Sequence, residues 1–454
     1  MDNETKETLA QLYRAAVAAA DPHISVRKNL TLEPGELIIG GARHHLSEIN
    51  NIYVLGAGKA AYKMALAAEE VLGGLITDGA VVTKDGHGGP LKRIRLYEAA
   101  HPVPDDRGVH AARGIMGLAR AAGPEDLVIC LFSGGASSLM ALPADGLTLK
   151  DKQETTRLLL LSGADIGEVN CVRKHLSAIK GGRLALAAYP ARVSTMMLSD
   201  VIGNDPGTVA SGPTAPDETT FLQAMEILKI RGLFERIPEN VRSYLEQGRL
   251  GALPETPKPG DSIFGVFGRV DNIIVADNMT ALRKAREVAG YMGYNGVIFD
   301  VAAHGEAREF ARRLARDVLS YREGGALPAC LITGGETTVT VKGAGKGGRN
   351  TETALAVALE IEGIEGISAL FAGTDGTDGP TDAAGAYADG YTAKRGSEKG
   401  PIAAEYLANN DSWSFFSSEG GLFVTGPTGT NVMDIGIILV KENFCKPSCK
   451  TGVY

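Results

Sequence analysis

Residues 52–65 pass from a short apolar run through a Gly-x-Gly turn into a helical pattern, and this change restricts the folds open to the chain. The stretch reads IYVLGAGKAAYKMA. Gly56, Gly58 and Ala61 match the G-x-G-x-x-[GA] pattern of a strand–turn–helix unit, which presents backbone N–H groups to a pyrophosphate. The pattern predicts a strand, a tight turn and a helix, with Lys59 in the turn.

Similar apolar runs alternate with helical segments along the first half of the chain. They include GAVVTKDG, EDLVICLFSGGASSLM and RVSTMMLSDVIG. Such alternation predicts a parallel sheet with helices on both faces, as in a Rossmann-like domain. Ligands of these sheets bind at the carboxyl ends of the strands, which is where the Gly-rich turns of this chain fall.

A proline-rich segment separates this first alternation from a second one. The length of 454 residues suggests two or three domains. GALPETPKPGDS is typical of a linker, and VDNIIVADN, YNGVIFDVAA and ACLITGGETTVTV follow it. We therefore expect a Rossmann-like domain over residues 1–251 and a second α/β domain over residues 252–454.

The composition excludes several classes of protein. A net charge of −8 argues against a general nucleic-acid binder. The sequence contains no secretory leader pattern and no apolar stretch of about 18 residues, so we expect no membrane span. Five cysteines without framework spacing indicate reduced thiols in the cytoplasm, and the C-x3-C of Cys445 and Cys449 is a weak metal candidate. The oligomeric state stays open, with a homodimer as one option.

Three Gly-rich segments carry positive charge or hydroxyl groups. Lys59 fits a phosphate or carboxylate site, a plain tight turn, or a nicotinamide cofactor site with Asp85 as ribose partner. LFSGGASSLM follows a buried strand and suits an oxyanion, or is a turn required by packing; its candidate residues are Ser133, Gly134, Gly135, Ser137 and Ser138. VTVKGAGKGGRNTETALAVAL brings Lys346 and Arg349 to the start of a helix expected near residue 351, after a strand ending at residue 342.

A basic run and two acidic loops complete the set of candidates. NCVRKHLSAIKGGRLA contains no acid. On one helix, Arg173, Lys180 and Lys174 would share a side that faces an anion, or the basic side chains would form a solvated helix face. His101 and His175 fit packed positions better than catalytic ones. The loops around Asp200 and around Asp375 and Asp378 suit Mg²⁺, or form tight turns of their own. Cationic loops, a metal and a base are the components of phosphoryl transfer from a nucleotide.

The motifs taken together resemble the type II glycerate 2-kinase family, whose C-terminal portion is the MOFRL region. They lie in the expected order between residues 56 and 434: GAGKAA, HPVPD, SGGASSL, VRKHLSAIKGGRLA, SDVIGNDPGTVASGPT, GGETTVTVKGAGKGGRN, GTDGTDGPTDAAGA and TGPTGTNVMD. The resemblance implies ATP-dependent phosphorylation of D-glycerate to 2-phosphoglycerate with a divalent cation, in two α/β domains facing a cleft. It also implies that Lys59 and Arg349 are essential.

These implications predict a role for each candidate residue. Lys59 and Arg349 would neutralise the transferring phosphoryl group. Asp200 would orient or deprotonate the 2-hydroxyl, with Glu336 as the competing carboxylate. The Gly56–Gly58 turn and the Ser133–Ser138 turn would hold nucleotide phosphates or the glycerate carboxylate.

Two alternatives use the same residues differently. Family members have also been labelled hydroxypyruvate reductases, and an NAD(P)H-dependent reductase would place its dinucleotide on the Gly56 turn. A ligand sensor would bind glycerate or a nucleotide without turnover.

Overall fold

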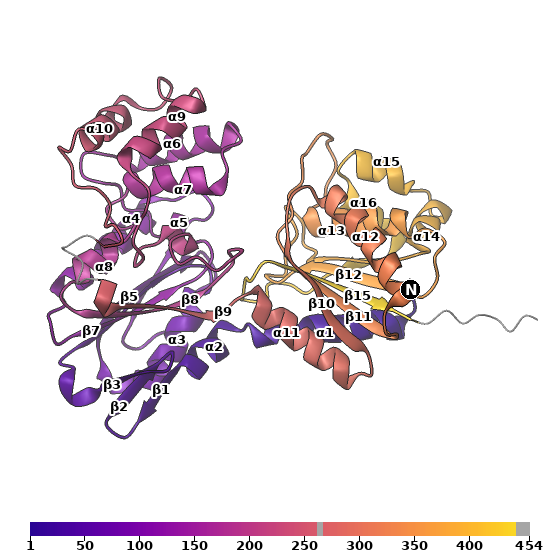
Figure 1. The fold of residues 1–454 in the computed structure, drawn as a ribbon, viewed down its shortest axis with the longest axis horizontal. Helices are drawn as coiled ribbons and strands as arrows, with labels where there is room; N and C mark the ends of the chain where they lie inside the picture. The colour runs from indigo at the N-terminus through magenta and orange to yellow at the C-terminus, as the bar shows by residue number, and fades with distance from the viewer. Residues whose placement is uncertain (261–266, 442–454) are drawn as a thin grey trace, which may run out of the picture. The chain divides into compact units, whose positions relative to one another are not determined.

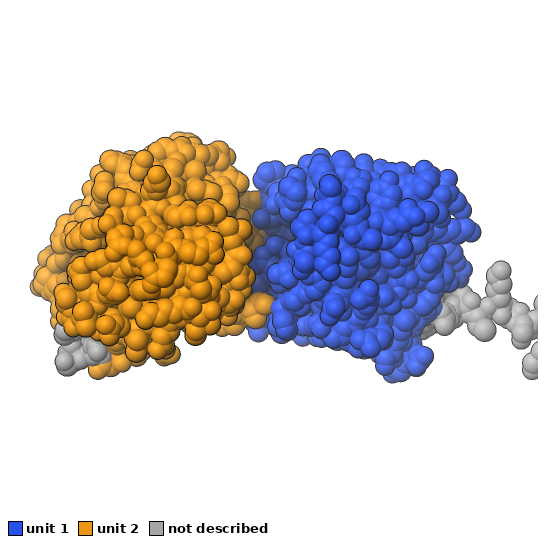
Figure 2. Space-filling view, turned by 90° about the horizontal axis from the view of Figure 1, so that it is seen from above, with its two compact units in different colours: residues 1–20, 278–428, 432–454 blue, residues 21–277, 429–431 orange. Residues whose placement is uncertain are grey.

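The structure, a computed structural model, describes residues 1–260 and 267–441. The chain forms two compact units, each described here by itself (Figure 2). The N-terminal unit contains residues 21–277 and 429–431. The C-terminal unit contains residues 1–20, 278–428 and the chain from residue 432. The Cys445 and Cys449 pair lies outside the described residues.

A six-stranded, fully parallel sheet forms the centre of the N-terminal unit (Figure 1). Its order β6-β5-β4-β7-β8-β9 corresponds to the 3-2-1-4-5-6 order of dinucleotide-binding folds, so the predicted parallel α/β sheet is confirmed. The order reverses between β4 and β7, the position at which such sheets bind ligands. The strands are β4 (Ile52–Ala57), β5 (Ile76–Lys84), β6 (Arg95–Ala99), β7 (Leu127–Phe132), β8 (Arg192–Leu198) and β9 (Val270–Ala276).

Helices and a small sheet surround this central sheet. Its core is apolar on both faces, with β7 buried along its whole length, as expected for a central parallel strand. A three-stranded antiparallel sheet consists of β1 (Leu30–Glu33), β2 (Glu36–Ile39) and β3 (Ala42–His45). The helices near the sheet are α2 (Pro22–Asn29), α3 (Ala61–Leu72), α4 (Asp106–Ala121), α5 (Ala136–Leu139) and α8 (Arg183–Ala188).

Four further helices form a separate group with a core of their own (Figure 1). Leu159, Val172, Phe221 and Leu228 are among its buried side chains. The helices are α6 (Leu149–Leu161), α7 (Ile166–His175), α9 (Phe221–Ile230) and α10 (Glu239–Arg249). Because α7 ends at His175, the expected single helical face from Arg173 to Lys180 is wrong, and Lys180 lies in the loop after the helix.

The C-terminal unit has a mixed sheet in the order β10-β11-β15-β12-β13-β14, in which β10 and β11 pair in parallel and the other neighbours are antiparallel. Its strands are β10 (Asn295–Ala303), β11 (Ala329–Gly335), β12 (Ile367–Gly373), β13 (Gly385–Asp389), β14 (Leu422–Phe423) and β15 (Asp434–Val440). Its helices are α1 (Asn3–Ala19), α11 (Asn278–Tyr291), α12 (Ala307–Gly324), α13 (Arg349–Glu360), α14 (Thr392–Glu398), α15 (Ala403–Ala408) and α16 (Ser412–Glu419).

These compact units differ from the expected division at residue 252. Helix α1 belongs to the C-terminal unit, because its buried Tyr13 donates a hydrogen bond of 2.7 Å to the Gly373 carbonyl. Strand β9 belongs to the N-terminal unit, because it pairs with β8. The proline-rich segment therefore lies inside the N-terminal unit, and the chain leaves that unit after Asp277.

Candidate active site

The Lys59 turn is joined tightly to the loop that follows β7. Gly58 has φ +136°, and a Cβ atom there would lie 2.1 Å from the Ser133 hydroxyl oxygen, so only glycine fits. The Lys59 amide donates to the Gly134 carbonyl at 2.9 Å. The Ala60 amide donates to the Ser133 hydroxyl at 3.0 Å. The two loops therefore form one structure at the point where the strand order reverses.

Lys59 lies among other basic side chains. Gly135 separates the ring of His101 from the aliphatic part of Lys59, since a Cβ atom on Gly135 would be within 3.2 Å of both. Burial, together with the charges of Lys59 and Lys84 and with His87, lowers the pKa of His101 to about 4. His101 is therefore neutral at pH 7, and the cluster has a local positive potential that favours an anion.

Asp200 lies against the same loop from the end of β8. A Cβ atom on Gly134 would be 2.0 Å from a carboxylate oxygen of Asp200, so the glycine allows this close approach. Asn431, in the short return segment 429–431, donates a hydrogen bond of 3.4 Å to the same oxygen. Lys59, the Gly134 loop and Asp200 thus converge at the carboxyl ends of three parallel strands.

The remaining N-terminal candidates have more local surroundings. Gly56 lies within β4, where a Cβ atom would be 2.6 Å from the Leu131 carbonyl oxygen, so its role is close packing of β4 on β7. The Ser137 hydroxyl is 2.7 Å from that of Ser211, and no side-chain partner of Ser138 is recorded among the described residues. Lys174 forms a buried ion pair of 3.2 Å with Asp217 and so lies apart from the Lys59 cluster.

Arg349 is the central cation of the C-terminal unit. Its guanidinium contacts Glu336 at 2.6 Å and both carboxylate oxygens of Asp434 at 2.5 and 2.9 Å. Burial alone would lower the pKa of Arg349, but the carboxylates, with Asp434 first, raise it above its usual value. The side chain is therefore permanently charged and held in one orientation at the first residue of α13. Asp434 is the last residue of the motif TGPTGTNVMD, and the sequence predicted no role for it.

Asp378 holds the same helix start from the other side. Its oxygens accept hydrogen bonds from the Asn350 amide at 2.9 Å, the Thr351 amide at 2.8 Å and the Thr351 hydroxyl at 2.7 Å. The side chain is buried. Asp378 therefore caps α13, and metal ligation by its carboxylate stays a prediction.

Asp375, the other metal candidate of this loop, is less buried than Asp378. It is partly exposed and accepts hydrogen bonds from the amide and hydroxyl of Thr377. Within residues 1–260 and 267–441, no group of three or more histidine, cysteine or acidic residues could hold a metal ion. A cation bound here would therefore take at most two such side chains from the described residues.

Lys346 lies in a loop whose structure differs from the expectation. Strand β11 ends at Gly335, so the strand predicted to reach residue 342 is wrong. Residues 343–348 instead lie along residues 409–413, and the Lys346 ammonium is 3.6 Å from the centre of the Trp413 ring. The indole holds this cation in place by a cation–π contact.

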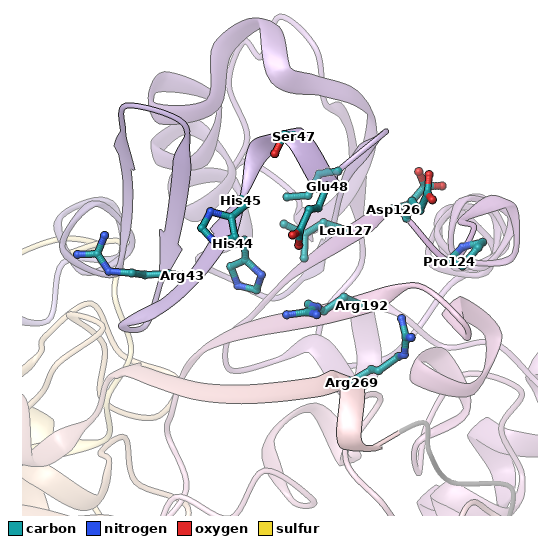
Figure 3. A pocket seen from close by; sticks show the side chains of 12 residues that line it. Arg43, His44, His45, Ser47, Glu48, Pro124, Asp126, Leu127, Arg192 and Arg269 are labelled. Carbon is teal, nitrogen blue, oxygen red and sulfur yellow. The ribbon is translucent and has the colours of Figure 1, made fainter.

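A separate cavity of about 450 Å³ lies at the amino ends of the parallel strands, where β7 and β8 begin (Figure 3). Arg192 and Arg269 lie on one side of it, and Glu48 and Asp126 lie on the other. None of the candidate residues lines it. It is therefore distinct from the candidate site at the carboxyl ends of the strands.

The fold and these sites define a class: a two-unit α/β protein with a lysine-bearing Gly-rich turn in one unit and an oriented arginine in the other. Comparison with known proteins agrees with this class. Residues 8–246 match the model "Domain of unknown function (DUF4147)", and residues 329–434 match the "MOFRL family" model. The first match covers more than half of the chain.

Relatives resemble the chain over nearly its full length. A "Putative hydroxypyruvate reductase" of Agrobacterium vitis is 42% identical, with 97% of this chain and 95% of the relative covered. A "Glycerate 2-kinase" of Pyrococcus horikoshii is 38% identical, with 96% and 98% covered. The crystal structure of a glycerate kinase from Thermotoga maritima has a TM-score of 0.83 at 38% identity, with 97% of this chain and 100% of that chain covered.

The chain belongs to this DUF4147–MOFRL family, and it is similar to these glycerate kinases over nearly its whole length. The predicted family is thereby confirmed. No helix within the described residues has the length and apolar character needed to cross a membrane.

Proposed function

We propose that this protein transfers the γ-phosphoryl group of ATP to the 2-hydroxyl of D-glycerate, giving 2-phosphoglycerate and ADP. The observation that carries the proposal is the match to a glycerate 2-kinase over 96% of the chain. The Lys59 turn and the oriented Arg349 provide the cationic groups that this chemistry needs.

The reaction requires charge neutralisation and removal of one proton. The glycerate 2-hydroxyl oxygen forms a bond to the γ-phosphorus, the bond to the ADP oxygen breaks, and the hydroxyl proton passes to Asp200. Lys59 and Arg349 stabilise the negative charge on the transferring group. The proposal thus requires groups from both units to act on the same phosphoryl group.

The protein's own carboxylates fit a weakly held divalent cation. Mg²⁺ commonly binds one or two carboxylates together with substrate phosphates and water. We propose Asp375 as the protein carboxylate of this site, since both oxygens of Asp378 are engaged by α13. A divalent cation held there would supply charge neutralisation for the nucleotide phosphates. We further propose that the enzyme works in the cytoplasm, where the buried free thiols of Cys130, Cys171 and Cys330 would stay reduced.

A second candidate function is NAD(P)H-dependent reduction of hydroxypyruvate, favoured by the name of the Agrobacterium vitis relative and by the strand order. A dinucleotide site of this kind uses an acidic residue after the second strand to bind the ribose. Asp85 occupies that position, but its two oxygens bind the guanidinium of Arg107 at 2.7 and 2.8 Å. This pairing favours the kinase.

One experiment separates the two activities. The purified protein is incubated with D-glycerate, ATP and Mg²⁺, ADP release is followed, and the product is identified by phosphorus NMR. A parallel sample contains hydroxypyruvate and NADH. We expect glycerate-dependent ADP and 2-phosphoglycerate. NADH consumption without ADP formation would replace the kinase with the reductase.

A further inference from the structure

A group of basic side chains surrounds the C-terminal end of α7 in the N-terminal unit. The Lys152 ammonium donates to the Leu176 carbonyl at 2.9 Å, and the Arg183 guanidinium donates to the Lys174 carbonyl at 3.0 Å. These two acceptors are only two residues apart. Arg173 belongs to the same last turn of the helix. Two cationic groups therefore bond to one helix end, and a third belongs to its last turn.

Lys180 extends this group into the interior. The residue is only 1% exposed, and its ammonium donates a long hydrogen bond of 3.4 Å to the Ala210 carbonyl. Lys152 is 7% exposed. We refer to Lys152, Arg173, Lys180 and Arg183 as the basic cluster.

The nearby carboxylates do not balance this charge. Asp217 pairs with Lys174 at 3.2 Å, and Glu255 pairs with His175 at 3.2 Å. Among the described residues, no carboxylate forms an ion pair with a member of the basic cluster. Buried cations that are not balanced by an opposite charge are costly, so such a cluster needs a physical explanation.

The pKa values of the two buried lysines reflect this electrostatic cost. Burial, followed by the charges of Arg173 and Arg183, lowers the pKa of Lys152 to about 7. Burial, followed by Lys152 and Arg173, holds the pKa of Lys180 well below its usual value. An anion placed among these groups would relieve the repulsion and favour their charged forms.

The basic cluster is continuous with the Gly-Ser loop of the candidate active site. Asn170 lies one turn before Arg173 on α7 and accepts a hydrogen bond of 3.0 Å from the Ser211 hydroxyl, which in turn contacts Ser137 at 2.7 Å. The Lys180 contact, Ala210, directly precedes Ser211. Hydrogen bonds through Ser211 therefore connect the helix that carries Arg173 to the loop that begins at Ser133.

The backbone at this connection is held in an unfavourable conformation. Ala210 and Ser211 have φ values of 55° and 60°, in the left-handed region that non-glycine residues seldom occupy. Such positions persist where the surroundings enforce them and are common near ligands. Arg173 and Arg183 are partly exposed, so the cluster has an edge that solvent reaches.

We propose that Arg173, Lys180 and Lys152 form an oxyanion subsite that takes a phosphate or carboxylate group of a substrate beside Ser137 and Ser211. The proposal rests on the proposed function in that its ligand is one of the two anionic substrates. Nucleotide phosphate and glycerate carboxylate share the required chemistry, and the experiment distinguishes them.

The test measures equilibrium binding of ADP and of D-glycerate separately by titration calorimetry, without turnover. Arg173→Gln removes a partly exposed charge of the cluster, and Lys150→Gln removes an exposed charge from the neighbouring helix α6 as the matched control. We expect Arg173→Gln to weaken one ligand about tenfold or more, as the loss of a charge-assisted hydrogen bond does. Weaker ADP binding identifies the phosphate, and weaker glycerate binding identifies the carboxylate. Unchanged binding of both ligands overturns the proposal.

A second variant separates binding from structure. Lys180→Met replaces a buried, unbalanced cation by an apolar side chain of similar length. We expect the melting temperature of the free protein to stay the same or rise, while the ligand weakened by Arg173→Gln is weakened again. A lower melting temperature with wild-type binding would assign Lys180 a purely structural role and overturn the proposal.

The outcomes also separate this subsite from the proposed function. If the protein does not phosphorylate glycerate but binds ADP through Arg173, the subsite stands and the kinase assignment fails. If it phosphorylates glycerate and Arg173→Gln binds both ligands normally, the kinase assignment stands and the subsite fails.

Discussion

At the scale of single residues, Lys59 and Lys63 form a matched pair. Lys59 lies in the turn before α3, whereas Lys63 lies one turn further along and contacts Asp21 at 3.4 Å. We expect Lys59→Ala to lower kcat by about 10²–10³-fold, as the loss of a group that stabilises transition-state charge does. Lys63→Ala should change kcat little. The assay is ADP release, with circular dichroism to verify folding, and near-normal turnover of Lys59→Ala would contradict the assignment.

His101 supplies a pH-dependent prediction. Its pKa is about 4 in the folded protein, against an ordinary value of 6.5. Between these values the unfolded chain binds a proton that the folded chain does not, so His101 makes the free energy of unfolding fall as pH falls from about 6.5 to about 4. Urea unfolding at pH 7.5 and pH 5 should therefore show a larger loss for the wild type than for His101→Gln. Equal losses would show that His101 is protonated in the native state.

At the scale of elements, the start of α13 depends on Asp378, and Asp375 provides the comparison. Asp378→Ala leaves two helix amides without their acceptor, so we expect a loss of about 2 kcal/mol in the free energy of unfolding. Trp413, the only tryptophan, is in the same unit and reports this transition by its fluorescence. An unchanged urea midpoint would contradict the capping role.

Asp375→Asn should change the Mg²⁺ requirement of the reaction rather than the stability of the fold. We expect its free energy of unfolding to change by less than about 0.5 kcal/mol, since its side chain is partly exposed and accepts hydrogen bonds from Thr377 in a local turn. The Mg²⁺ concentration needed for half-maximal ADP release should rise several-fold, because Mg²⁺ sites of this kind have few protein carboxylates. An unchanged Mg²⁺ requirement would exclude Asp375 as a ligand.

Elements could be predicted from the sequence where local patterns decide them. The change from apolar run to Gly-x-Gly to helix located β4 and α3, because backbone sterics and periodicity suffice there. Residues 337–341 are rich in β-branched side chains and predicted a strand, yet Thr338 bonds the Gly305 carbonyl and Thr340 bonds the Glu306 carboxylate. The pairing is limited to one isolated parallel bridge between Thr338 and Glu306, so their β propensity does not produce a strand here.

The candidate site was predictable only in part, for a related reason. Gly-rich loops and isolated cations are visible in the sequence, so Lys59, Gly134 and Arg349 could be chosen. Their partners depend on contacts between distant segments: Asn431 reaches Asp200 across 231 positions, and Asp434 reaches Arg349 across 85. No local pattern encodes such pairings.

At the scale of the whole molecule, the two compact units are not consecutive halves of the chain. Helix α1 is the clearest case, because it begins the chain but belongs to the C-terminal unit. Tyr13 is 1% exposed, packs edge-to-face on Phe423 and bonds the Gly373 carbonyl, so the N-terminal helix completes the C-terminal core. We expect Tyr13→Ala to cost about 3–5 kcal/mol, as buried aromatic truncations do. Tyr13→Phe, which loses only the hydrogen bond, should cost about 1 kcal/mol.

The position of Trp413 allows this prediction to be tested for the C-terminal unit alone. Because the fluorescence of Trp413 reports only on the C-terminal unit, the Tyr13→Ala variant should unfold at lower urea by this probe. Tyr291→Ala, at a position 80% exposed in the same unit, is the control and should leave the midpoint unchanged. If Tyr13→Ala left the Trp413 transition in place, helix α1 would not be part of the C-terminal core.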